Sequence, residues 1–337
     1  MKKRILVTGS HGFVGNHLVR YVLDNTDWDI VGMDSFRHAG DPLRNHDDPR
    51  YTVLCHDLNA PIGDRLSAKI GDVNYIINLA SISDVDLSIR DPLWVWENNT
   101  RLIGNILSFA HLKKSQGLEK FIHCSTDEVF GPAPPGYFHT EWDTICPSNP
   151  YSASKAAQEA LCITYWRTYG LPLIITNCMN MVGETQEPTK FIPKIIWTVQ
   201  GYGEVVVHGS PEHIGCRMYL DAKNLADAWV FLLNNTQLET YLGEGGPQRP
   251  SRYNIVGQEE ITNLELAERI AKIAGKRLRY RFKDFHLTRP GHDRRYALDG
   301  SKIAALGWKH PIPLDETLKR VVAWSIKHPE WLEGGHS

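Results

Sequence analysis

Four side chains that can exchange protons lie close together in the sequence. Asp127 and Glu128 are adjacent and follow a run of residues typical of a buried strand. Tyr151 and Lys155 are four residues apart, so on a helix they lie on one face, one turn from each other. A lysine ammonium beside a phenol favours the phenolate, and we expect Lys155 to lower the Tyr151 pKa toward the range of a general base. With Thr126, these residues predict an acid–base site.

The surrounding pattern is typical of strands that alternate with helices. Apolar, β-branched runs predict six strands, at 4–8, 29–34, 51–55, 73–81, 121–125 and 173–177. A helical pattern covers 98–112, and a cap signal at 148–150 begins the helix that carries Tyr151. This alternation predicts an α/β fold with a doubly wound parallel sheet, whose ligands lie beyond the carboxyl ends of the strands.

A glycine turn joins the first strand to the first helix and carries Gly9, Gly12 and Gly15. A glycine triplet alone is weak, but the flanking strand and helix favour a dinucleotide-binding turn at the pyrophosphate. Asp34 ends the second strand, where an acid binds the ribose hydroxyls of NAD and repels the extra phosphate of NADP. Asp34 could also be a solvated turn residue, and Arg37 could accept a phosphate. We expect NAD.

The pattern becomes less regular after Gly183. We therefore expect an NAD-binding Rossmann domain and a smaller, less regular substrate domain, with the chain divided as 1–183 plus a returning 218–245, against 184–217 plus 246–337. An amphipathic helix at 261–274 follows a cap signal at Thr262. The basic stretch 277–295 fits either a solvated face or a diphosphate clamp, because guanidinium groups bind phosphate bidentately.

Composition limits the partners. The chain has 337 residues and a formal net charge of -2, so no basic excess points to nucleic acid or to an anionic membrane. No apolar run has the length of a membrane span or a signal peptide. Six scattered cysteines without a CxxC pair suggest reduced, mostly buried thiols of a cytoplasmic protein. We expect no metal site, because His and Cys never cluster at ligand spacing.

Together these motifs resemble the extended short-chain dehydrogenase/reductase family over nearly the whole chain. The glycine pattern at 9–15 and the Tyr151/Lys155 pair are shared by the broad family. The triplet 126–128 and the segment 289–296 are closer to its dTDP-glucose 4,6-dehydratase group. Membership would imply an NAD-dependent lyase that acts on a nucleotide-diphosphate sugar.

The resemblance implies a role for each acid–base residue. Tyr151, assisted by Lys155, takes the proton of the sugar 4-hydroxyl while Thr126 hydrogen-bonds the same oxygen, and NAD accepts the C4 hydride. Glu128 then removes the C5 proton, and protonated Asp127 gives a proton to the departing 6-hydroxyl. The hydride returns to C6 and Glu128 reprotonates C5, so the net reaction is loss of water. Burial and mutual repulsion separate the pKa values of two neighbouring acids as this division requires.

The resemblance also implies binding residues. Expected cofactor contacts are Gly9, Gly12, Phe13, Val14, Gly15, Asp34, Ser35, Arg37, Asp57, Leu58, Leu79, Ala80, Ser81, Asn98, Tyr151 and Lys155. Expected substrate contacts are Ser83, Thr126, Asn180, Lys190, Phe191, His208, Arg217, Arg289 and His292. The family suggests a homodimer through a four-helix bundle, formed by the helices that start near 98 and 151.

Several positions depart from the dehydratase pattern. The loop 81–87 and Met181 differ, and Gly215 replaces the arginine that holds the diphosphate, with Arg217 two residues later. These changes spare the acid–base residues, so the substrate stays open among dTDP-glucose, UDP-glucose, another base or an altered hexose. Two alternatives remain: an epimerase or other enzyme of the same family, and a non-catalytic NAD-sensing or scaffold protein that kept the fold.

Overall fold

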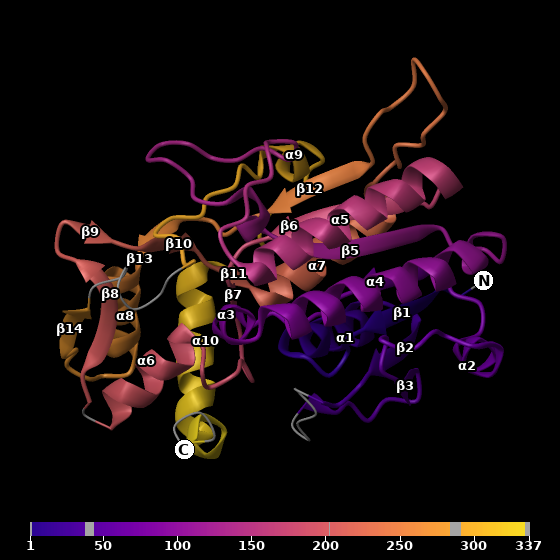
Figure 1. Cartoon of the computed structure of the whole chain (residues 1–337). Helices are drawn as coiled ribbons and strands as arrows, with labels where there is room; N and C mark the ends of the chain where they lie inside the picture. The colour runs from indigo at the N-terminus through magenta and orange to yellow at the C-terminus, as the bar shows by residue number, and fades with distance from the viewer. Residues whose placement is uncertain (1, 38–43, 202, 284–290, 334–337) are drawn as a thin grey trace.

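A seven-stranded parallel sheet with helices on both faces forms the larger part of the molecule (Figure 1). The computed structural model describes residues 2–37, 44–201, 203–283 and 291–333. The strands follow the order β12-β6-β5-β4-β1-β2-β3, and their bounds are β1 Arg4–Thr8, β2 Asp29–Asp34, β3 Tyr51–Cys55, β4 Tyr75–Asn78, β5 Lys120–Thr126, β6 Leu173–Cys178 and β12 Ser251–Ile255. The order changes direction between β1 and β4, which confirms the doubly wound Rossmann-type fold.

Two apolar layers hold the sheet between its helices. One layer packs the sheet against α1 and α7, and the other packs it against α4 and α5. These helices are α1 Phe13–Asn25, α7 Ala222–Asn235, α4 Pro92–Lys114 and α5 Pro150–Tyr169. Because both faces are covered, the central strands are apolar almost throughout, as parallel strands usually are. Helix α4 begins earlier than the pattern predicted, because Asp91 accepts from the Trp94 amide and Pro92 opens the first turn.

The seventh strand, β12, is a difference from the sequence prediction. It pairs in parallel with β6, although the sequence analysis predicted six strands and assigned 246–337 to the substrate part. Arg252 and Asn254 interrupt the apolar pattern, yet both are fully buried. These buried polar side chains gave no strand signal in the sequence.

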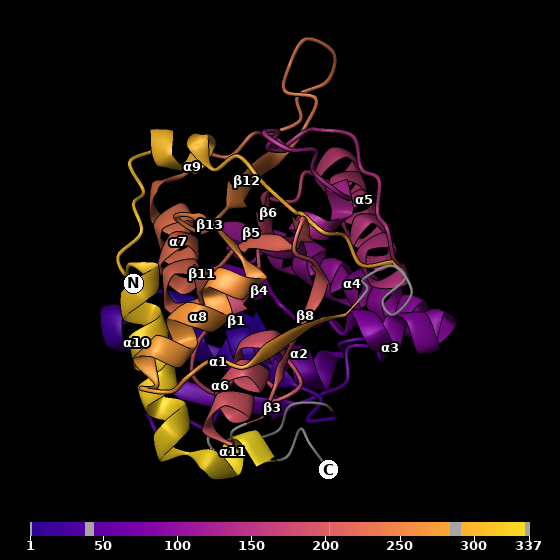
Figure 2. The same ribbon diagram turned by 90° about the vertical axis from the view of Figure 1, so that its left-hand side faces the viewer.

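A smaller part lies beyond the carboxyl ends of the strands, where the arrow of β12 points (Figure 1). Its own apolar core packs α6, α8 and α10 with β8 (Figure 2). Thr262 caps α8 in a reciprocal hydrogen-bonded box with Glu265, which confirms that cap signal. The remaining elements of the chain are η2 Asp127–Phe130, α2 Asp64–Ile70, α3 Val85–Arg90, α6 Phe191–Gln200, α8 Asn263–Ile273, α9 Ser301–Ala305, α10 Leu314–Lys327, α11 Pro329–Glu333, β7 Met181–Val182, β8 Val205–Ser210, β9 His213–Ile214, β10 Cys216–Met218, β11 Leu220–Asp221, β13 Glu260–Thr262 and β14 Tyr280–Lys283.

Three further expectations concern membranes, metals and thiols. Within the described ranges, none of the helices has the length and apolar character needed to cross a bilayer. The same ranges contain no group of three or more His, Cys, Asp or Glu side chains that could hold a metal ion. All six cysteines are free, but only Cys162 and Cys178 are buried, so the expectation of mostly buried thiols is wrong.

Candidate active site

The structure brings the five predicted acid–base residues together where β5 ends. Thr126 is the last residue of β5, and Asp127 and Glu128 open the short 3-10 helix η2. The Thr126 hydroxyl donates to Asp127 Oδ1 over 2.9 Å and accepts from the Glu128 amide over 3.3 Å. Tyr151 and Lys155 lie in the first two turns of α5, whose first turn is packed against this corner. One threonine hydroxyl therefore fixes the Asp127 carboxyl group and the backbone of Glu128 at the start of η2.

Asp127 has the environment of a carboxylic acid that keeps its proton. Burial, with the nearby charge of Glu128 as the second cause, raises the pKa of Asp127 to about 7. In the described part of the chain nothing hydrogen-bonds its Oδ2, although that atom is buried. A protonated carboxyl with such an oxygen can donate to a substrate hydroxyl that comes within hydrogen-bonding distance.

Glu128 is held from two sides. Its Oε2 accepts from Asn149 Nδ2 over 2.9 Å and from the Tyr296 hydroxyl over 3.4 Å. Burial raises the Glu128 pKa, and the hydrogen bond from Asn149 and the charge of Arg217 oppose that rise. The two acids thus differ: Glu128 receives donors that favour its charged form, whereas Asp127 Oδ2 receives none from the described residues.

The prediction that Lys155 lowers the Tyr151 pKa is wrong for this structure. The Tyr151 pKa is raised well above its usual value by burial first, and then by the carboxyl groups of Glu128 and Asp127. The Lys155 ammonium donates to the Cys124 carbonyl and to Gln158 Oε1, each over 2.7 Å. Burial lowers the Lys155 pKa. The lysine therefore anchors α5 to β5, and burial together with the adjacent acids raises the pKa of the phenol.

A fully buried ion pair supports this corner, and the sequence analysis missed it. Arg252 on β12 donates to Glu159 Oε2 on α5 and to Asn177 Oδ1 on β6, each over 2.8 Å. Asn177 Nδ2 donates to Glu159 Oε1 and to the Thr126 carbonyl. The Arg252 guanidinium also lies 5.0 Å from the centre of the Phe130 ring in η2. One network thus connects three strands and α5 directly beneath the acids.

The glycine turn has the geometry of a pyrophosphate site. Gly9 has φ +67°, which side-chain-bearing residues rarely adopt, and a Cβ on Gly15 would lie 2.0 Å from the Gly9 carbonyl oxygen. No side chain caps the N-terminus of α1 at Gly12, so the first amides of the helix, from Phe13 and Val14 on, point out of the turn. These features fit a dinucleotide phosphate.

The acids predicted to bind the nucleosides lie next to that turn. Asp34 accepts from the His11 amide over 2.9 Å and from the Phe36 amide over 3.0 Å, which fixes its carboxylate at the end of β2 beside Ser35. Arg37 forms an ion pair with Asp57 over 2.9 Å. Because Asp57 offsets the charge of Arg37, this arrangement suits ribose hydroxyls better than a 2′-phosphate.

Three further predicted cofactor residues, Leu79, Ala80 and Ser81, follow β4 at the end of β1. The amides of Leu79 and Ala80 donate to the Thr8 hydroxyl, each over 3.2 Å, and the half-buried Ser81 follows them. The backbone of Leu58 is held by Asn105.

Asn98, another predicted cofactor residue, lies on α4 next to the more buried Asn99. The Asn98 side chain accepts from Asn59. Asn99 is fully buried and bonds both the amide and the carbonyl of Ile82, over 2.8 and 3.0 Å. Two successive asparagines on a helix gave no sequence signal to tell which one faces inward.

The predicted substrate residues lie at several separate places in the structure. Lys190 and Phe191 begin α6, and the charge of Lys190 reaches Glu128. Ser83 and Asn180 are exposed, and His208 lies on β8. His292 hydrogen-bonds Asp86 Oδ1 over 2.8 Å through Nε2. Arg289 lies outside the described residues.

Arg217, two residues after Gly215, is bonded to the backbone of its own strand and of a distant segment. Its guanidinium donates to the backbone carbonyls of Cys216, Asp293 and Arg294 over 2.6–2.7 Å and lies 4.6 Å from the centre of the Tyr296 ring. A Cβ on Gly215 would itself lie 3.2 Å from the Arg294 carbonyl oxygen. Arg217 therefore holds the segment 291–296, which carries part of the basic stretch, against the acids.

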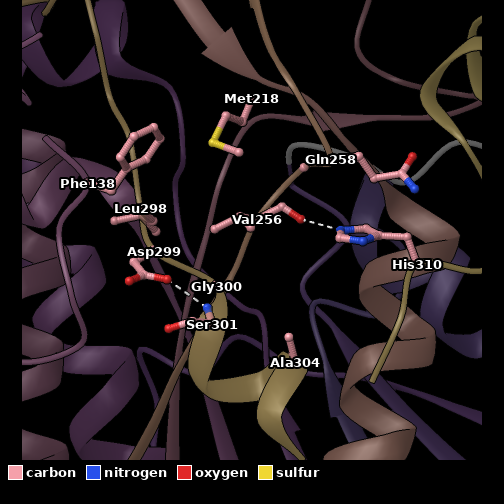
Figure 3. Close-up of a pocket in the computed structure, with 11 residues that line it drawn as sticks. Phe138, Met218, Val256, Gln258, Leu298, Asp299, Gly300, Ser301, Ala304 and His310 are labelled. Carbon is pink, nitrogen blue, oxygen red and sulfur yellow. Dashed lines mark hydrogen bonds between the residues drawn. The ribbon is translucent and has the colours of Figure 1, made fainter. Parts of the chain in front are cut away.

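A separate pocket of about 530 Å³ lies outside this acid–base group (Figure 3). Phe138, Leu298 and Asp299 line one side, and Gln258 and His310 line the other. None of the five acid–base residues is among the residues that line it. The functional site is therefore assigned from the chemistry at the end of β5.

Comparison with known proteins gives the family. The NAD dependent epimerase/dehydratase family matches residues 5–250. The dTDP-glucose 4,6-dehydratase of Escherichia coli is 32% identical, covering 98% of this chain and 94% of its own. The low-salt glycan biosynthesis protein Agl12 of Haloferax volcanii is 33% identical, with coverage of 97% and 99%. The solved dTDP-glucose 4,6-dehydratase DesIV of Streptomyces venezuelae, with NAD and TYD bound, has a TM-score of 0.84 at 29% identity, with coverage of 98% and 99%.

The chain belongs to the NAD dependent epimerase/dehydratase family, whose fold and glycine turn it shares. This confirms the resemblance to the extended short-chain dehydrogenases, with dTDP-glucose 4,6-dehydratases among its relatives and structural neighbours. The cofactor is NAD, as in the solved neighbour and as the turn at 9–15 allows.

Proposed function

We infer that the protein is a nucleotide-sugar 4,6-dehydratase of the dTDP-glucose or UDP-glucose type. The observation that carries this proposal is the unequal pair of acids beside Tyr151. Asp127 has a pKa of about 7 and an oxygen with no hydrogen-bond partner among the described residues, and Glu128 is held by donors that favour its ionised form. An elimination of water needs one acid and one base at the same time, and this pair provides them.

Each residue has one task in this proposal. Bound NAD supplies a hydride acceptor for sugar C4 and a hydride donor for C6. Tyr151 takes the proton of the 4-hydroxyl, which requires that the positive charge of bound NAD offset the burial and the acids that raise its pKa, and Thr126 orients the same oxygen. Glu128 removes the C5 proton, which the new C4 ketone has made acidic. Asp127 gives its proton to the 6-hydroxyl, which leaves as water, and Glu128 returns its proton to C5 when C6 receives the hydride.

Incubation of the protein with dTDP-glucose, and separately with UDP-glucose, tests the function. We expect a product one water lighter that shows the alkali-induced absorbance of a 4-keto-6-deoxy sugar. The variant Glu128→Gln should still oxidise C4 but should form no such product. A stereoisomer formed without loss of water would instead support the epimerase alternative, and inertness toward every nucleotide hexose would overturn the proposal.

We also propose that two copies pair through α4 and α5. These helices lie side by side on one face of the sheet, and Leu93, Trp96 and Leu112 expose large apolar side chains on α4. Such an exposed apolar surface typically marks an interface. We expect a homodimer in size-exclusion chromatography with light scattering, and a folded monomer for Trp96→Glu. A monomeric wild type would exclude this pairing.

A further inference from the structure

Asn149 makes contacts in three directions from one side chain. Its Oδ1 accepts from the Ser152 amide over 2.9 Å and so caps α5, the helix that carries Tyr151. Its Nδ2 donates to Glu128 Oε2 over 2.9 Å and to the Gly291 carbonyl over 3.1 Å. Because the cap requires the amide oxygen at Ser152, the two N–H groups must face Glu128 and Gly291.

The backbone around Gly291 fits closely against this asparagine. Gly291 has φ +77°, and a Cβ there would lie 3.1 Å from the Ser148 carbonyl oxygen and 3.3 Å from Asn149 Cβ. Only glycine allows such an approach at that backbone angle. Asn149 is itself 95% buried, so water does not compete readily for its donors.

The segment that begins at Gly291 also returns to Glu128. Tyr296, at its other end, donates to the same Oε2 as Asn149 does. Burial and the charge of Glu128 raise the Tyr296 pKa, so its hydroxyl keeps its proton and remains a donor. The segment 291–296 is therefore fixed to Glu128 at both ends, through Asn149 at one end and through Tyr296 at the other.

We propose that Asn149 is a positioning residue for proton abstraction: its amide holds the Glu128 carboxylate and the start of segment 291–296 in one fixed arrangement, so that Glu128 is ionised and aimed when the sugar is bound. This inference rests on the proposed dehydration, because it assigns Glu128 the role of base. It leaves C4 oxidation to Tyr151, which Asn149 touches only through the helix cap.

Besides the neutral Asn149 amide, several titratable groups face Glu128. Each of them contributes to the pH dependence of proton abstraction. They are Asp127 of η2, Tyr151 of α5, Lys190 at the start of α6, Arg217 of β10, and Asp293 and Tyr296 of the segment 291–296. None of these groups changes in a variant at position 149. A shift in the titration of Glu128 would therefore report the change made at position 149, whether a lost donor or an added charge.

The variant Asn149→Asp separates the cap from the donor. Aspartate caps helices about as well as asparagine, but it cannot donate and it places a like charge beside Glu128. We expect exchange of the C5 hydrogen with solvent deuterium to slow by about 10- to 100-fold, the range for a hydrogen bond to a charged group. Single-turnover C4 oxidation, followed by the absorbance of the reduced cofactor, should change by less than about threefold, because the cap is kept.

The pH profile gives a second readout. Glu128 must be ionised to accept the proton, and loss of its donor raises its pKa, so the acid limb of elimination should move to higher pH. Thr262→Ala is the matched control, because it removes the cap of α8, a helix that does not carry the acid–base residues. That control should lose stability without changing the C5 exchange or the acid limb.

A measurement without substrate keeps the inference separate from the proposed function. The Glu128 carboxyl can be titrated by carbon NMR in the wild type and in Asn149→Asp, and its midpoint should rise in the variant. An unchanged midpoint, or equal slowing of C4 oxidation and C5 exchange, would show that Asn149 only caps the helix. A wild type that oxidises no nucleotide hexose would refute the dehydratase proposal, while the NMR titration would still decide on Asn149.

Discussion

The two sides of the active site are built differently. The inner side consists of Thr126, Asp127, Tyr151 and Lys155, which lie close in sequence on β5, η2 and α5. The outer side is the segment 291–296, which comes from a distant part of the chain. Arg217 binds the backbone of that segment, and the Ala133 amide adds a hydrogen bond to its Arg295 carbonyl.

This difference suggests which side sets the reaction and which sets the substrate. The inner side rests on the buried Arg252–Glu159 pair and has little freedom to change. The outer side is held by hydrogen bonds to distant parts of the chain, largely through its backbone, and the departures at Gly215 and Arg217 fall on or beside it. We therefore expect changes on the inner side to abolish chemistry or stability, and changes on the outer side to alter mainly the affinity for the sugar nucleotide.

The largest effect should follow Tyr151→Phe. Removal of the phenol hydroxyl takes away the base of C4 oxidation, so kcat should fall by about 10²–10⁴-fold. NAD binding, measured by calorimetry, should change little. Tyr165→Phe is the control, because that half-buried tyrosine lies on the same helix and bonds Ser108 instead. Near-normal turnover of Tyr151→Phe would remove the inner side from the chemistry.

The next effect concerns stability. Arg252→Ala should lower the free energy of unfolding by about 3–5 kcal/mol, because it leaves Glu159 buried without its cation. Arg281→Ala breaks an exposed pair with Glu204 and should cost less than about 1 kcal/mol. Urea denaturation measures both. Equal losses for the two variants would show that the buried network does not support the corner beneath the acids.

The sequence predicted the inner side better than the outer side for a physical reason. Strand, turn and cap signals are local, so the ends of β5, the start of α5 and the cap at Thr262 could all be predicted directly. The contacts of Arg217 and the burial of Arg252 depend on segments far apart in the chain. The partners of the Lys155 ammonium could not be predicted from its spacing to Tyr151 either, because it donates to the Cys124 carbonyl and to Gln158.

The protonation of Asp127 should appear as a pH dependence of stability. Its folded pKa of about 7 lies above the usual aspartate value of 3.8. The folded protein therefore keeps a proton that the unfolded chain releases, so the contribution of Asp127 worsens as pH rises through this window and is least favourable above 7. Asp127→Asn removes that charge, and its gain in melting temperature should be larger at about pH 8.5 than at about pH 5.

Asp143 provides a control of opposite sign for that experiment. Burial alone would raise the Asp143 pKa. Hydrogen bonds from Tyr137, Thr140 and His139 outweigh it and lower that pKa overall. That carboxylate contributes stability above its unfolded pKa and loses it as pH falls through the folded pKa, so Asp143→Asn should be destabilising at neutral pH. A gain for Asp127→Asn that did not grow with pH would mean that Asp127 is ionised throughout.

The smallest expected effect tests the outer side directly. Arg217→Met keeps an apolar stem over Tyr296 but removes the donors to the Asp293 and Arg294 carbonyls. Loss of such hydrogen bonds loosens the segment 291–296, so we expect KM for the sugar nucleotide to rise about tenfold, with kcat within about threefold. Hydrogen exchange at 291–296 should quicken in parallel. If kcat instead fell as far as in Tyr151→Phe, Arg217 would act on the acids themselves, and the division between a chemical side and a binding side would not hold.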